Sequence, residues 1–136
     1  MTDDTIRLER VYPHSPSAVW RALTEPELHA RWWAAGDVRA VVGHRFALDM
    51  GKWGKQPCEV LAVEPERLFS YRFATGTLDT TVTWQLVPEG DGATRLTLTH
   101  AGFDLESPLA RAAFEGMGAG WPGVLDRLAA ALRSSS

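Results

Sequence analysis

The sequence has only one cysteine, Cys58, and this scarcity limits its chemistry. A single cysteine excludes an internal disulfide and a metal site built from several cysteines. The four histidines, His14, His29, His44 and His100, are scattered and lack the close spacing of metal ligands. We therefore expect neither a metal ion nor another cofactor.

Long hydrophobic runs are absent as well. No apolar segment approaches the ~18 residues that span a membrane, and the first residues, MTDDT, are too acidic and polar for a signal peptide. The formal net charge of −3 argues against a nucleic-acid partner, because dedicated nucleic-acid binders are usually basic. These features predict a cytoplasmic protein that binds neither membranes nor nucleic acids.

Signatures of catalysis are missing too. The sequence contains no HExxH, GxSxG, P-loop or dinucleotide-binding motif. Cys58 and His100 could act as nucleophile and base only if the fold brought them together. Their spacing gives no reason to expect this, and a buried structural thiol is the simpler interpretation. We predict no catalytic residue, and whether the protein is an enzyme stays open.

The apolar residues that are present alternate with polar ones in six segments, which predicts six strands. The predicted strands cover residues 5–12, 45–50, 57–64, 69–73, 81–86 and 95–100. The strand at 57–64 has apolar residues on both faces, so which face points inward stays open. If Arg10 and Glu59 both pointed inward, they would need each other as partners, because a buried charge needs a counter-charge.

Three helices are predicted from capping residues and apolar spacing. Ser15 and Pro16 suit the start of a short helix, and Pro26 begins a second short helix. Ser107 and Pro108 repeat this start before a long helix over 107–133, whose apolar residues recur at helical spacing. Pro122 lies inside this helix and predicts a local break, because proline lacks the backbone N–H.

The order of the elements predicts an α+β fold. One strand is followed by two short helices, five strands and one long helix, and the short connections between the strands favour an antiparallel sheet. Only the long C-terminal helix can cover the apolar face of this six-stranded sheet, which would curl around it. We interpret residues 1–136 as a single domain with its core over 5–133.

A run of small residues, GMGAGW at 116–121, interrupts an otherwise good helix. Each interior glycine costs about 0.5–1 kcal/mol relative to alanine. The run has two interpretations. In the first it is structural and allows close packing or a kink of the helix. In the second it leaves room for a ligand beside Gly116 and Gly120. The six tryptophans are equally ambiguous, because large aromatic side chains fill cores and also line apolar pockets.

Four stretches of the sequence resemble one known superfamily. They are VWRALTEPELHARWW (19–33), VVGHRF with DMGKWG (41–54), TTVTWQLVPEGDGATRLTLTHAGF (80–103) and FEGMGAGWPGVLDRLAAAL (114–132). With them the chain resembles bacterial members of the START/Bet v 1-like (SRPBCC) superfamily, in the group named for the C-terminal domain of the Hsp90 ATPase activator. The resemblance implies the helix-grip fold, in which a cavity lies between a curved sheet and a long helix.

The resemblance implies less about function. Members of the superfamily include lipid-transfer domains, plant hormone-binding proteins, polyketide cyclases and Hsp90 cochaperones, and they share no catalytic motif. The cochaperone has a further N-terminal domain, for which 136 residues leave no room. An Hsp90-directed or other protein-interaction role, and a cyclase- or hydrolase-like activity, are therefore alternatives to ligand binding.

We predict that a small apolar molecule binds in the cavity between the sheet and the C-terminal helix. His100 and Tyr71 are expected to supply the few polar contacts, with Trp33 near the mouth. The predicted lining is Trp33, Phe46, Leu48, Met50, Tyr71, Trp84, Leu98, His100, Gly116, Met117, Gly120 and Trp121.

Overall fold

Six strands pair in one antiparallel sheet with the order β1-β6-β5-β4-β3-β2 in the computed structural model, which describes residues 4–135. The strands are β1 (Ile6–Tyr12), β2 (Arg45–Asp49), β3 (Lys55–Glu64), β4 (Leu68–Phe73), β5 (Thr80–Glu89) and β6 (Ala93–Ala101). The helices are α1 (Pro16–Thr24), α2 (Pro26–Trp32), the short 3₁₀ helix η1 (Gly51–Trp53) and α3 (Pro108–Ser135). This order confirms the predicted helix-grip fold, with β1 at the edge of the sheet beside β6.

The sheet has one buried and one exposed face because apolar and polar residues alternate along its strands. In β6, Leu96 and Leu98 are buried, whereas Thr97 and Thr99, which alternate with them, are partly exposed. Trp84 in β5 lies opposite Leu98 and is buried with it. The predicted inward orientation of these strands is therefore confirmed.

The strand whose orientation the sequence left open contains an irregularity. The register of β3 with β4 shifts between Val60 and Ala62, as in a β-bulge. Before the shift, Cys58 and Val60 are buried; after it, Val63 packs against the core and Leu61 is exposed. The strand has apolar residues on both faces because its inward face changes along its length.

The predicted helix starts are confirmed by their caps. The Ser15 hydroxyl accepts a hydrogen bond from the backbone N–H of Ala18 at 3.2 Å, and Pro16 is the first residue of α1. The Ser107 hydroxyl accepts in the same way from Ala110 at 3.4 Å, before Pro108 begins α3. Each cap satisfies one backbone N–H that the first turn of a helix leaves unpaired.

The expected break at Pro122 is wrong. α3 runs as one helix from Pro108 to Ser135, with Pro122 inside it. Trp121, Leu125 and Leu128 on the same helix are almost fully buried. We attribute the continuity of the helix to this tertiary packing, which offsets the loss of one backbone hydrogen bond.

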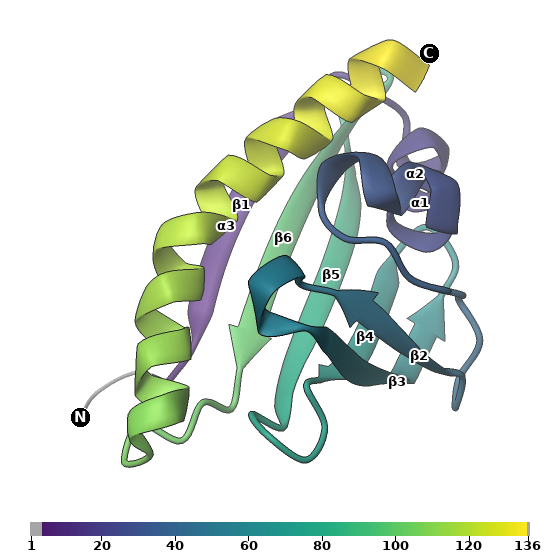
Figure 1. Ribbon diagram of the computed structural model, residues 1–136. Helices are drawn as coiled ribbons and strands as arrows, with labels where there is room; N and C mark the ends of the chain where they lie inside the picture. The colour runs from purple at the N-terminus through teal and green to yellow at the C-terminus, as the bar shows by residue number, and fades with distance from the viewer. Residues whose placement is uncertain (1–3, 136) are drawn as a thin grey trace.

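The helices lie on the inner side of the curved sheet. Figure 1 shows α3 running beside β1 and β6, with α1 and α2 near its C-terminal end, and the hairpin of β2, η1 and β3 on the other side of the molecule. α3 contacts α1, α2 and β1. The tryptophans Trp32, Trp84 and Trp121 are the largest side chains buried in the core between these layers.

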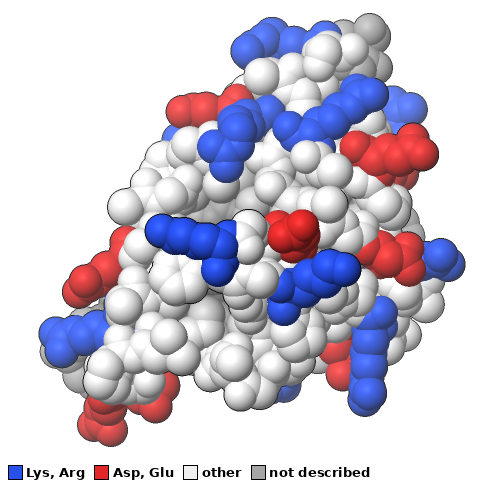
Figure 2. All heavy atoms as spheres, in the orientation of Figure 1, with Lys and Arg blue, Asp and Glu red and all other residues white. Residues whose placement is uncertain are grey.

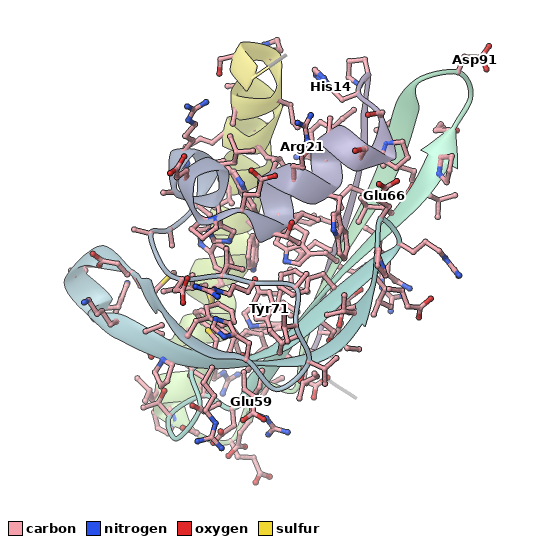
Figure 3. All side chains as sticks on the ribbon, turned by 90° about the vertical axis from the view of Figure 1, so that its right-hand side faces the viewer. His14, Arg21, Glu59, Glu66, Tyr71 and Asp91 are labelled. Atoms are coloured by element: carbon pink, nitrogen blue, oxygen red, sulfur yellow. The ribbon has the colours of Figure 1, made fainter. Side chains whose placement is uncertain are left out.

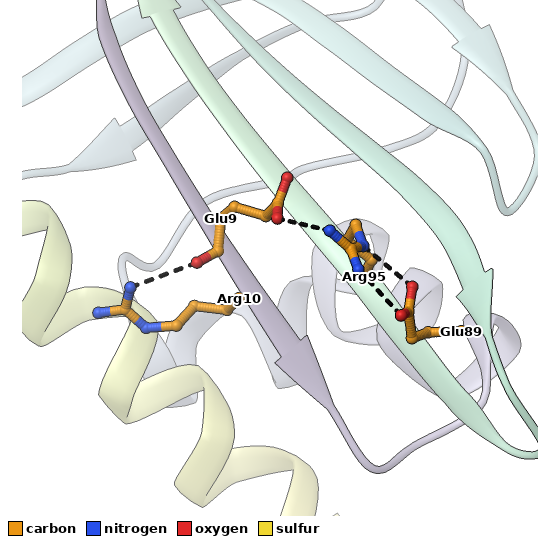
Figure 4. A network of polar contacts seen from close by, with 4 residues as sticks. All are labelled: Glu9, Arg10, Glu89 and Arg95. Carbon is orange, nitrogen blue, oxygen red and sulfur yellow. Dashed lines mark hydrogen bonds and ion pairs between the residues drawn. The ribbon is translucent and has the colours of Figure 1, made fainter.

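Charged residues on the sheet pair with one another across strands. Arg95 of β6 donates hydrogen bonds to both carboxylate oxygens of Glu89 at 2.9 Å and to Glu9 of β1 at 2.8 Å (Figure 4). The hydrogen bonds from Arg95, and its positive charge, lower the pKa of Glu89. Arg95 thus connects β1, β6 and β5.

Candidate functional site

A pocket of about 810 Å³ lies between α3 and the hairpin that carries η1. One stripe of α3 forms its first wall, with Leu109, Ala112, Ala113, Gly116, Met117, Gly120, Trp121, Val124 and Arg127. The rest of its lining comes from Trp33, Asp49, Met50, Gly51, Lys52, Trp53, Gln56, Phe73, Thr77 and Leu78. Uncharged surface dominates this face of the molecule, with a few charged side chains near its middle (Figure 2). The volume is within the range of small-molecule sites.

The glycines of α3 keep part of this space open. At Gly116 and at Gly120, no atom from another part of the chain lies within 4 Å of the place where a Cβ would stand. Gly118 differs, since its Cβ would touch the side chain of Ile6 at 3.9 Å. Gly116 and Gly120 therefore face the pocket, and larger residues at these two positions would project into it.

Three neighbouring aromatic rings form part of the pocket wall. The ring of Trp33, which follows α2, lies 4.8 Å from that of Trp121 and 5.9 Å from that of Phe73, measured between centroids. Trp121 and Phe73 are buried, and Trp33 is partly exposed. These rings offer an apolar surface with defined geometry to a bound molecule.

The structure brings six of the twelve predicted residues together around this pocket. These are Trp33, Met50, Gly116, Met117, Gly120 and Trp121. The other six are not part of its lining but are buried in the core: Phe46, Leu48, Tyr71, Trp84, Leu98 and His100. Bulky side chains thus fill the deeper part of the space between sheet and helix, and the pocket lies beside them.

His100 is fully buried and uses both of its ring nitrogens. The Trp121 Nε1–H donates to Nδ1 of His100 at 3.2 Å, so His100 Nε2 carries the proton and donates to the Thr80 hydroxyl at 2.8 Å. Thr80 in turn donates to the carbonyl oxygen of Phe73 at 3.3 Å. Burial lowers the pKa of His100 to about 3, so the ring is neutral at physiological pH.

Tyr71 is also committed to contacts within the core. Its hydroxyl accepts a hydrogen bond from Trp84 Nε1 at 3.2 Å, and burial raises its pKa well above the usual value. Figure 3 shows Tyr71 pointing into the interior between the sheet and the helices. The polar contacts expected from Tyr71 and His100 are therefore directed to other core residues instead of the pocket.

The two alternative side-chain pairs considered from the sequence do not form. Glu59 pairs with Arg45 at 3.5 Å and lies on the outer side of the sheet (Figure 3), whereas Arg10 reaches Asp126 at 3.9 Å. The inward Arg10–Glu59 pair is therefore wrong.

Cys58 and His100 are likewise not hydrogen-bonded to each other. The Cys58 thiol donates to the carbonyl oxygen of Gln56 at 3.5 Å, and burial raises its pKa to about 12. Since the thiolate is the nucleophile, this environment makes Cys58 unreactive at neutral pH.

The charged residues of the pocket, Asp49, Lys52 and Arg127, were not among those predicted from the sequence. Arg127 continues the stripe of α3 that contains Gly116, Gly120 and Val124, so helical spacing could have identified it. Lys52 and Trp53 lie in η1, a short helix that was not among the three helices predicted from the sequence. The position of η1 beside α3 depends on the curvature of the sheet, so no local sequence pattern predicts it.

Two further properties concern residues 4–135. Their His, Cys, Asp and Glu side chains form no cluster of three or more that could hold a metal ion. No helix in this range combines the length and apolar character needed to cross a membrane.

Comparison with known proteins identifies relatives of this fold. A protein of Mesorhizobium loti, MLL2253, is 35% identical, with 97% of this chain and 98% of that chain covered and a TM-score of 0.84. CalU16 of Micromonospora echinospora is 30% identical over 94% of this chain and 75% of its own, with a TM-score of 0.76. DynU16, from the dynemicin biosynthetic locus, is 27% identical over 99% of this chain but only 49% of its own, with a TM-score of 0.80. A search of curated proteins gave no match.

The family assignment rests on most of the chain. The family described as activator of Hsp90 ATPase homolog 1-like protein matches residues 13–133, which run from the end of β1 to the last turns of α3. Together with the likeness to MLL2253 over nearly its whole length, this match shows that the chain belongs to the activator of Hsp90 ATPase homolog 1-like family, within the SRPBCC superfamily.

Proposed function

We propose that the protein binds a small, mainly apolar molecule in the pocket between α3 and the η1 hairpin. The observation that carries this proposal is the open space beside Gly116 and Gly120. Glycine inside a helix is destabilising, by about 0.5–1 kcal/mol relative to alanine. A helix that only packed against the sheet would gain stability from larger residues at these two open positions.

The surroundings of this space support the same function. Met50, Met117 and Val124 line the pocket, together with the neighbouring rings of Trp33 and Trp121. Methionine adapts its shape to irregular ligands, and aromatic rings supply a large apolar contact area. The exposed Trp53, with 68% of its surface accessible, adds an apolar group to the lining contributed by η1.

Binding of the uncharged dye Nile red, followed by its fluorescence, tests this proposal. The wild type should bind the dye, and Gly116→Leu and Gly120→Leu should each weaken binding about tenfold, because a leucine side chain would occupy the space of the ligand. Circular dichroism should show intact folding, since leucine favours helix more than glycine does.

Ala119→Leu is the matched control, because Ala119 is an exposed residue of α3 that does not line the pocket. It adds a side chain of similar size to the same helix and should leave dye binding unchanged. The proposal is wrong if the wild type binds no dye, or if the three leucine variants bind it as well as the wild type does.

A further inference from the structure

The pocket contains more cationic than anionic side chains. Lys52 and Arg127 are cationic, and Asp49 is the one carboxylate among the residues that line the pocket. Asp49 Oδ1 accepts a hydrogen bond from the backbone N–H of Gly51 at 3.0 Å, so this carboxylate helps to hold the turn that begins η1. The pocket thus has a net positive charge although the whole chain is acidic.

Arg127 presents free donors at one end of the stripe on α3. Its Nε–H donates to the carbonyl oxygen of Trp32 at 3.1 Å, which ties the side chain to the end of α2. Its two terminal nitrogens have no hydrogen bond or ion pair to any of the residues 4–135. Because Nε is engaged, the free edge of the guanidinium is the pair Nη1 and Nη2, whose fork geometry matches a carboxylate or phosphate.

Lys52 adds a second cation from the opposite wall. Its ammonium group lies 5.3 Å from the ring centroid of Trp53 and has no carboxylate partner among the described residues. A cation in this position attracts an anion without fixing its orientation, because the ammonium is a compact point charge. Lys52 therefore complements Arg127 electrostatically.

The spacing along α3 places Arg127 next to the apolar part of the pocket. Arg127 follows Gly120 by seven residues, which corresponds to about 10 Å along a helix. A molecule with an acidic group at Arg127 could lay its apolar body over Trp121 and Gly120 toward Gly116. We infer that the ligand is an amphipathic anion, an apolar molecule with one acidic group that Arg127 binds; this inference rests on the proposed function.

The test compares a fluorescent fatty acid, cis-parinaric acid, with its uncharged methyl ester. At neutral pH and low salt, the wild type should bind the acid about tenfold more tightly than the ester, because hydrogen bonds between ionised groups are the stronger ones. Arg127→Gln should remove this difference by weakening binding of the acid and leaving that of the ester unchanged. Arg111→Gln is the matched control, since Arg111 is an exposed arginine of α3 that does not line the pocket.

A second measurement uses the wild type alone, so it does not depend on how the variants fold. Raising the salt concentration should weaken binding of the acid several-fold and leave the ester unaffected, because salt screens the attraction of exposed charges. Equal affinity for acid and ester, or a loss in Arg127→Gln that is equal for both, would overturn the inference and leave apolar binding intact. Binding of neither probe would overturn the proposed function together with the inference.

Discussion

The indole N–H of Trp121 donates to Nδ1 of His100 at 3.2 Å, and this contact joins the middle of α3 to the end of β6. Trp121 also lines the pocket, beside Trp33. One residue therefore connects the core to the candidate binding site, and the side chains that support it determine the shape of the pocket.

Trp121→Ala should lower the free energy of unfolding by about 3–5 kcal/mol. Trp121 is only 1% exposed, and its removal leaves a cavity and deprives His100 of a donor. Trp53→Ala is the control, because Trp53 is exposed and should change stability by no more than about 0.5 kcal/mol. Urea denaturation measures both, and a loss below about 1 kcal/mol for Trp121→Ala would contradict the assigned packing of α3.

Stability should fall on mild acidification because two histidines are buried in the neutral form. Burial lowers the pKa of His29 to about 4 and that of His100 to about 3, from a usual value of 6.5. The unfolded chain therefore binds more protons than the folded chain once the pH falls below about 6.5. The stabilisation is complete above that pH and is lost progressively down to the two folded-state pKa values.

The expected loss is about 1.5 kcal/mol for each histidine between pH 6.5 and about pH 5. Urea midpoints measured over this range test it. In His100→Gln the slope of stability against pH should be about half that of the wild type, because only His29 then contributes. A slope unchanged by this substitution would show that His100 does not carry the effect.

Alanine substitutions at three glycines should have opposite effects. Gly116→Ala and Gly120→Ala should each stabilise the protein by about 0.5–1 kcal/mol, because the new methyl group meets open space. Gly36→Ala should destabilise it by about 1–3 kcal/mol, because a Cβ there would overlap the carbonyl oxygen of Ala47 in β2. Thermal unfolding of the three variants measures this contrast, and destabilisation by the two α3 variants would mean that the helix is packed tightly at these positions.

Most of the fold was predictable because its signals are local. The alternation in β6 and the serine–proline starts of α1 and α3 identified elements without any tertiary information. Two features could not be predicted from the sequence because their causes are tertiary: the inward face of β3, which was left open, and the course of α3 at Pro122, where a break was wrongly expected. The bulge near Val60 changes which face of β3 points inward, and the packing of Trp121 and Leu125 keeps α3 continuous through Pro122.

The candidate site was predictable only in part. Periodicity indicates that Tyr71 and Trp84 point inward. It does not indicate that their side chains fill the interior and form a hydrogen bond with each other. Arg127 lies on the same stripe as Gly120, but the periodicity of apolar residues does not identify a charged residue. Which inward residues remain accessible to a ligand depends on three-dimensional packing, which has no periodic signature.

The central claim is that a small apolar molecule binds beside the glycines of α3, and nuclear magnetic resonance tests it most directly. In a titration of the ¹⁵N-labelled protein with Nile red, the largest amide shifts should occur at Gly116, Met117 and Gly120, together with the indole N–H of Trp33. The amide signals of Gly90 and Gly92, in the turn between β5 and β6, should not shift. The account is contradicted if saturating dye leaves the α3 glycines unshifted, or if the largest shifts lie on the outer face of the sheet.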